Sequence, residues 1–293
     1  MDDNSEINAH ALLRAAMAGD LATVKGILAT QPELGKDASA GATALQGASQ
    51  QNRFECLPVL LSHSDVNQLD NLDRTALHFA AATGAVECVE ILAPLSDATI
   101  QSLVGGTALM AAAQAGHADC VRALLPFSDA DTRNKEGDTP LTIATLLEEI
   151  EVVKALAGRC DATKIGSLGR SALMVAAGSS THPGREDNCL EFFRVLIPHS
   201  DLRALCDGKT ALDFAVETQK WAGADFLASC MSPETALALL GSAPDGVRLE
   251  RCEAIAEQAQ LSRVVLMASA GSHAQDGQDA LSAEAQARAA KRI

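Results

Sequence analysis

The chain has 293 residues, a net charge of −15 and only 3% aromatic residues, with one Trp and no Tyr. This charge argues against nonspecific nucleic-acid binding, because phosphates require a basic surface. No apolar run reaches the ~18 residues that a membrane span needs, so we expect no membrane segment. The eight cysteines lack a CxxC or other metal-type spacing, which predicts a reducing compartment and neither metal nor cofactor.

The first part of the chain predicts a pair of short helices. Its first ten residues are acidic and lack the basic and apolar segments of a secretory signal, so we expect none. Leu12, Leu13 and Ala16 are followed by a break at Gly19-Asp20 and a second apolar series. We interpret residues 8–36 as an N-terminal capping helix pair, since the ends of a solenoid need a polar outer face.

The octet Arg-Thr-Ala-Leu-His-Phe-Ala-Ala at residues 74–81 recurs in similar form at five other places in the chain. Its Thr position recurs 32 residues apart in the first five copies, and the sixth follows after 39. These positions are Thr43, Thr75, Thr107, Thr139, Ser171 and Thr210. A fixed period of this length predicts a solenoid of stacked repeats.

Each copy predicts a tight turn followed by a helix. Gly stands two residues before the Thr in five copies and Asp73 in the other, which indicates a residue with positive φ. The Thr or Ser is a good helix N-cap. Ala follows five residues later in every copy, which predicts helices packed too closely for a larger side chain. These alanines are Ala48, Ala80, Ala112, Ala144, Ala176 and Ala215.

A second helix is predicted after a short break in each copy. It begins with an acidic residue that the helix dipole favours, such as Glu87 or Asp119. The next residue is Cys56, Cys88, Cys120 or Val152 in successive copies, which is typical of a small buried apolar position. A Pro ends the helix in three copies, because proline disrupts a helix interior.

This unit resembles the ankyrin repeat, whose hallmark is T-P-L-H-x-A on a period of about 33 residues. The segments that carry the resemblance are TALHFAA at 75–81 and TPLTIA at 139–144. It implies an all-α solenoid of helix-turn-helix repeats with β-hairpin fingers. The predicted division is an N-terminal cap at 8–36, six repeats at 37–231, a C-terminal helical cap at 232–268 and a mobile tail at 269–293. The Pro-x-Ser-Asp repeat ends favour the bacterial variety of this family.

Two features of the chain could suggest other chemistry. The fifth copy has about eight extra residues within 178–190, which either form a functional loop or reflect tolerated drift. The segment Asp-Gly-Lys-Thr at 207–210 resembles a phosphate-binding loop, but Arg203 stands where that motif needs Gly. His182 and Cys189 share the inserted segment without an identifiable acid-base partner. We therefore expect no catalytic residue, and an enzyme is the least favoured reading.

The expected function is noncatalytic binding of a partner protein through the finger turns and the concave face of the first helices. Exposed apolar and Arg side chains at these positions fit an anchor-rich interface, although fingers packing on one another would hide part of that area. The candidate residues are Leu72, Arg74, Leu103, Val104, Met110, Leu168, Arg170 and Met174. The partner is unnamed, and the chain is expected to be a monomer in the cytoplasm. Two settings stay open: a bacterial effector delivered to a host cytoplasm, and a resident inhibitor, immunity or scaffold protein.

Overall fold

The computed structural model describes residues 3–36, 43–178, 186–242, 244 and 249–258. The chain forms two compact units, Met1–Leu227 and Ala228–Ile293. The first unit opens with α1 (Asp3–Ala18), α2 (Leu21–Thr30) and a 3-10 turn, η1 (Pro32–Lys36). Helix α1 packs against both α2 and the first helix of the repeat series.

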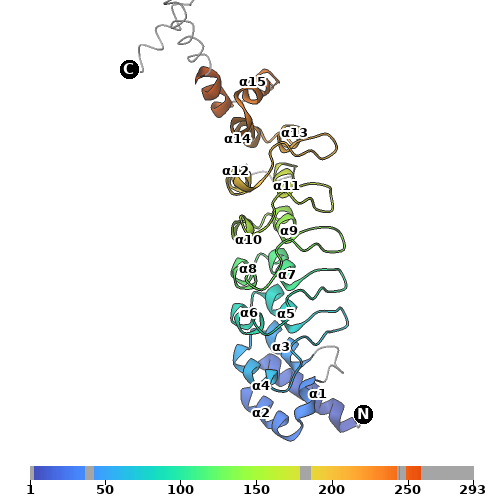
Figure 1. Cartoon of the computed structure of the whole chain (residues 1–293). Helices are drawn as coiled ribbons and strands as arrows, with labels where there is room; N and C mark the ends of the chain where they lie inside the picture. Colours follow the sequence, from blue (N-terminus) through green and yellow to red (C-terminus); the bar gives the residue numbers. More distant parts are fainter. Residues whose placement is uncertain (1–2, 37–42, 179–185, 243, 245–248, 259–293) are drawn as a thin grey trace, which may run out of the picture. The chain divides into compact units, whose positions relative to one another are not determined.

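Paired helices then repeat along the first unit (Figure 1). The inner helices are α3 (Ala44–Gln50), α5 (Ala76–Thr83), α7 (Ala108–Gln114), α9 (Pro140–Leu146), α11 (Ala172–Gly178) and α13 (Ala211–Glu217). The outer elements are η2 (Phe54–Cys56) with α4 (Leu57–Leu61), α6 (Val86–Leu92), α8 (Ala118–Leu124), α10 (Ile150–Leu156), α12 (Glu186–Leu196) with η3 (Ile197–His199), and α14 (Trp221–Met231). Each inner helix packs on the next inner helix, which confirms the predicted solenoid.

The expected turn and cap explain where the inner helices begin. The residue two before the cap has a positive φ, from 57° at Asp73 to 94° at Gly137, and Gly41 lies outside the described residues. The cap hydroxyl then accepts a hydrogen bond at 3.2–3.4 Å from the backbone N–H three residues later in five copies. In the remaining copy, Thr75, the ring of His78 accepts from the Thr75 N–H and also contacts the Thr75 hydroxyl.

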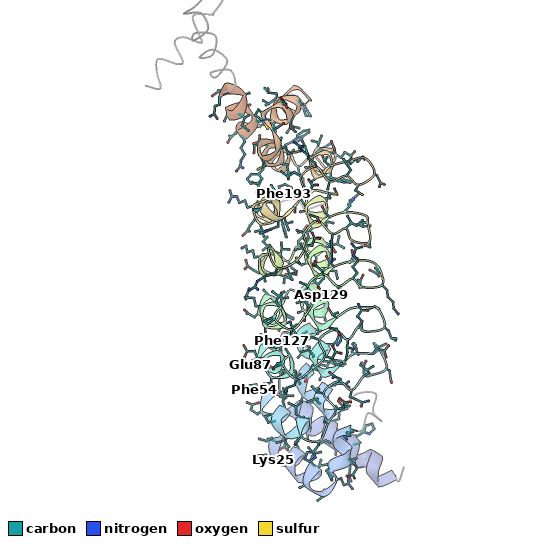
Figure 2. The ribbon with its side chains drawn as sticks, viewed as in Figure 1. Lys25, Phe54, Glu87, Phe127, Asp129 and Phe193 are labelled. Carbon is teal, nitrogen blue, oxygen red and sulfur yellow. The ribbon has the colours of Figure 1, made fainter. Side chains whose placement is uncertain are left out.

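The core lies between the inner and outer helices and consists mainly of small side chains. Ala112 and its counterparts are at most 4% exposed, and the Cys or Val near the start of the first four outer elements is fully buried. The acidic residues predicted at the outer-helix N-termini lie in the first turns of α6, α8 and α10. Figure 2 shows Phe54, Glu87 and Phe127 on the outer-helix side of the stack.

The fingers are the loops 70–74, 102–106, 134–138, 166–170 and 206–209, and all project from the inner helices on the same side (Figure 1). A backbone hydrogen bond of 2.9 or 3.0 Å joins the first and last residues of each loop. The expected β-hairpins are much reduced, because only isolated bridges pair Ile165 with Ser171 and Cys206 with Lys209 in the described part of the chain. Each loop is too short for a longer ladder.

The second unit holds α15 (Pro233–Ser242) and a helix over residues 250–258. Ser232 caps α15 by accepting a hydrogen bond from the Thr235 N–H at 3.1 Å, and Pro233 stands at the first helical position, where proline is favoured. Helix α14 spans the division between the two units, so our boundary at 231 and 232 stays a prediction. The tail at 269–293 and most of the 178–190 insertion lie outside the described residues. Of the helices that the structure describes, none is both long and apolar enough to cross a bilayer.

Candidate functional site

Successive fingers are joined to one another by hydrogen bonds. The Leu103 N–H donates to the Leu72 carbonyl at 2.9 Å, and the Lys135 N–H donates to the Val104 carbonyl at 3.2 Å. Between fingers 134–138 and 166–170, the Ser167 N–H donates to a carboxylate oxygen of Asp138 at 2.8 Å. These bonds fix the spacing of successive fingers, so side chains at their tips are held in a row.

The apolar side chains predicted at the fingertips are exposed. Leu72 is 48% exposed, Leu103 46%, Val104 70% and Leu168 58%. These side chains therefore keep about half or more of their surface open to solvent. Packing between the fingers hides only part of the apolar row.

Two of the candidate residues do not lie on the surface that the sequence predicted for them. Met110 and Met174 are only 2% exposed, so they do not line the concave surface. Both occupy the third position of an inner helix, whose side chain points toward the neighbouring repeat. Gln46 and His78 occupy the same position, and they reach carbonyl groups of the following finger, those of Arg74 at 3.2 Å and Gly106 at 3.1 Å.

Arg74 and Arg170 both stack on aromatic rings. The Arg74 guanidinium lies 4.4 Å from the centre of the Phe79 ring, and Arg170 lies 4.2 Å from that of Phe214. Arg74 also donates to a carboxylate oxygen of Asp70 through Nε at 2.9 Å and Nη2 at 2.7 Å. Burial raises the pKa of Asp70, but the hydrogen bonds from the Arg74 guanidinium and from the N–H groups of Arg74 and Leu72 together outweigh it, so the pKa is lowered.

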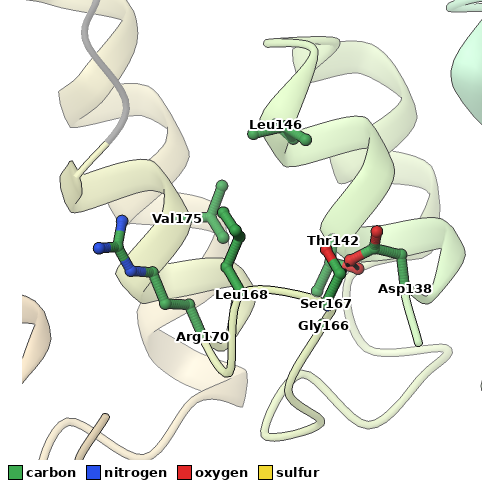
Figure 3. Close-up of a pocket in the computed structure, with 8 residues that line it drawn as sticks. All are labelled: Asp138, Thr142, Leu146, Gly166, Ser167, Leu168, Arg170 and Val175. Atoms are coloured by element: carbon green, nitrogen blue, oxygen red, sulfur yellow. Dashed lines mark hydrogen bonds between the residues drawn. The ribbon is translucent and has the colours of Figure 1, made fainter. Parts of the chain in front are cut away.

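A shallow hollow lies at the foot of finger 166–170, against the inner helices α9 and α11 (Figure 3). Leu146, Leu168 and Val175 form its apolar wall, with Leu168 and Val175 side by side. Asp138 and Thr142 lie at one end, and the Arg170 guanidinium points away from them at the other. The hollow therefore combines an apolar surface with a cationic edge.

Further exposed apolar residues extend the finger surface beyond the predicted set. Leu69 is 39% exposed, Ile165 46% and Leu205 64%. Leu69 and Ile165 stand six residues before their respective caps, and Leu205 stands five before Thr210. A comparison of the residues five and six positions before each cap would have identified them.

His78 has a structural environment rather than a ligand environment. Its side chain is 4% exposed, and its Nε2 is 3.1 Å from the Gly106 carbonyl. Burial is the largest cause that lowers its pKa, because a buried imidazolium loses hydration. Among the described residues, no group of three or more His, Cys, Asp or Glu side chains is arranged to hold a metal ion.

One of the comparisons with known proteins finds a family. A family model described as ankyrin repeats (3 copies) matches residues 12–102 and 94–166. Together the two matches span more than half of the 293-residue chain. No curated protein matches the sequence.

Proposed function

The chain belongs to the ankyrin-repeat family, whose members generally act as protein-interaction modules, and we propose that it binds a partner protein without catalysis. The proposed contact surface comprises the fingertips and the concave side of the inner helices. Leu72, Leu103, Val104 and Leu168 are its apolar anchors. Arg74 and Arg170 border them.

One observation supports this proposal above the others. Apolar side chains are about half or more exposed on three fingers, and hydrogen bonds hold those fingers in register. Burying such a side chain against a partner yields roughly 1.5–3 kcal/mol before ordering costs. Because the fingers are already ordered, a smaller part of that free energy is lost on binding.

A surface variant tests the proposal directly. We expect the triple variant Leu72→Ser, Leu103→Ser, Leu168→Ser to lose the main protein that wild type captures from native lysate. Its melting temperature stays within a few degrees of wild type, because the side chains contribute little to the core. Affinity capture with mass spectrometry, together with thermal melting, measures both properties.

A matched variant changes three exposed apolar residues on the outer-helix side, Phe54, Leu95 and Phe127, to Ser. It removes a comparable apolar area, so it controls for a general loss of surface hydrophobicity. We expect this control to keep the partner. If the finger variant keeps the partner and the control loses it, the binding surface is the outer-helix side instead.

The setting of this interaction is a separate proposal. The Pro-x-Ser-Asp repeat ends motivate delivery to a host cell as a bacterial effector, and the alternative is a resident inhibitor or scaffold. A translocation reporter fused to the chain separates them, because only an effector is exported. Retention of the reporter in the producing cell supports the resident role.

A further inference from the structure

Arg74 and Arg170 occupy the same position in two repeats, 96 residues apart, but their surroundings differ. Both guanidinium groups stack on a Phe ring, which restricts their orientation. At Arg74, the carboxylate of Asp70 accepts two hydrogen bonds from the guanidinium, and the Asp70 side chain is only 4% exposed. Arg74 is therefore paired within its own finger.

At Arg170, the residue that corresponds to Asp70 is Gly166. Among the described residues, no carboxylate lies within ion-pair distance of Arg170. A Cβ atom at Gly166 would collide with a carboxylate oxygen of Asp138, which accepts a hydrogen bond from the Ser167 N–H. The carboxylate of Asp138, from finger 134–138, therefore occupies the space that an Asp side chain at position 166 would need. The N–H groups of the Arg170 guanidinium can then pair with an external carboxylate.

The surface beside Arg170 is unusually apolar for its position. Leu146 is 49% exposed at the end of its inner helix, where the corresponding residues of other repeats are Gln50, Ala82 and Gln114. Leu168 is 58% exposed and lies beside Val175 in the same hollow (Figure 3). An aliphatic surface next to an oriented guanidinium is complementary to a ligand that presents an aliphatic group next to a carboxylate.

We propose that this hollow binds a segment of the partner protein in which an aliphatic side chain is adjacent to a carboxylate. The aliphatic side chain contacts Leu146, Leu168 and Val175, and the carboxylate accepts two hydrogen bonds from Arg170. The inference rests on the proposed function and specifies the chemistry of the partner. It also assigns different roles to the two arginines: Arg170 contacts the partner's carboxylate, whereas Arg74 supports its own finger.

The probe is a library of random short peptides displayed on phage and selected against the full chain at about 0.15 M salt. We expect the selected peptides to share an aliphatic residue next to Asp, Glu or a free C-terminal carboxylate. The best of them, made synthetically, is then measured against Arg170→Gln, Arg170→Lys and the control Arg122→Gln by fluorescence anisotropy. Thermal melting confirms that each variant is folded.

The expected affinity loss is about tenfold or more for Arg170→Gln, since the carboxylate loses charge-assisted hydrogen bonds. Arg170→Lys also weakens binding, because an ammonium group keeps the charge but lacks the planar pair of donors. Arg122→Gln leaves the affinity within about twofold, because Arg122 lies on the outer helix α8, outside the proposed contact surface, where it pairs with Asp119.

Three outcomes would overturn the inference: no peptide is selected, the selected peptides lack a carboxylate, or their affinity is the same for wild type and Arg170→Gln. A fourth is self-association of the wild type that Arg170→Gln abolishes, which would make the occupant a second copy of the chain. The proposed function fails separately, when the finger triple variant retains its captured protein.

Discussion

Asp138 in finger 134–138 accepts a hydrogen bond at 2.8 Å from the backbone N–H of Ser167 in finger 166–170. The same carboxylate is 3.5 Å from the Thr142 hydroxyl and occupies the space next to Gly166. One buried side chain therefore joins two repeats and dictates a glycine in the second. The relationship also shapes the hollow beside Arg170.

Asp138 and Gly166 should be energetically coupled. Asp138→Ala leaves the Ser167 N–H without its acceptor and is expected to cost about 1–3 kcal/mol of unfolding free energy. Gly166→Ala introduces a clash and is expected to cost about 1–3 kcal/mol. Because the first change removes the atom that the second would meet, the double variant loses less than the sum. Urea denaturation of the four proteins measures the cycle, and strictly additive losses would contradict the assigned contact.

Ala112 tests the packing of the inner helices. It is 0% exposed, and Ala stands at this position in every copy. Ala112→Leu is expected to lower the unfolding free energy by about 1–3 kcal/mol, because the neighbouring helices leave no room for a larger side chain. Ala115→Leu, at an exposed position of the same repeat, is the control and should change it by less than about 0.5 kcal/mol. Equal melting temperatures for both variants would refute the packing register.

Asp73 tests the turn. Its φ is 57°, in the left-handed region where the corresponding residues of the following repeats are glycines. Asp73→Gly is expected to leave stability unchanged or raise it by less than about 1 kcal/mol, since relief of backbone strain exceeds the added chain entropy. Asp73→Val should be destabilising, because a β-branched residue strongly disfavours positive φ. A clear loss of stability in the Gly variant, measured by urea denaturation, would reveal a contact of the carboxylate that matters more than the strain.

His78 should make stability depend on pH. Burial lowers its pKa in the folded state below the value of about 6.5 expected for the unfolded chain. The unfolded state then binds the proton more readily than the folded state does. The stability that neutral His78 contributes is therefore fully present above pH ~6.5 and is lost as the pH falls toward the folded-state pKa. His78→Gln keeps a side chain that can bridge repeats, as Gln46 does, but cannot titrate. The difference in unfolding free energy between wild type and His78→Gln should therefore change across this window. A constant difference from pH 7.5 down to about 5 would contradict the prediction.

The cysteines of the outer helices should resist thiol reagents. Cys56, Cys88 and Cys120 are fully buried, and burial raises the pKa of all three, to about 12 for Cys88 and about 11 for Cys120. Reaction requires a thiolate in contact with solvent, so we expect labelling only after unfolding. The exposed Cys230 provides the fast-reacting reference. Rapid maleimide labelling of the three in the native protein, or stoichiometric zinc by elemental analysis, would show that they have another role.

Much of the architecture follows from the sequence because its physical causes are local. The cap hydroxyl at Thr107, the positive φ at Gly105 and the small side chain of Ala112 each act within a few residues of their own position. Repetition of such local signals at a fixed period indicates stacked repeats without knowledge of any distant contact. The exposure of Leu72 and Leu168 was predictable for the same reason, since fingertips face away from the helices.

Contacts between repeats were decided only by the tertiary structure. The sequence predicted Met110 and Met174 on the binding surface, but the third helical position points toward the neighbouring repeat, where both are buried. Similarly, Arg74 and Arg170 look equivalent in the sequence, and only the folded chain shows Asp70 paired with Arg74 while Asp138 fills the space beside Gly166. The direction of a side chain, and which atom occupies the space next to it, depends on the rotation between adjacent repeats, and no single repeat encodes that rotation.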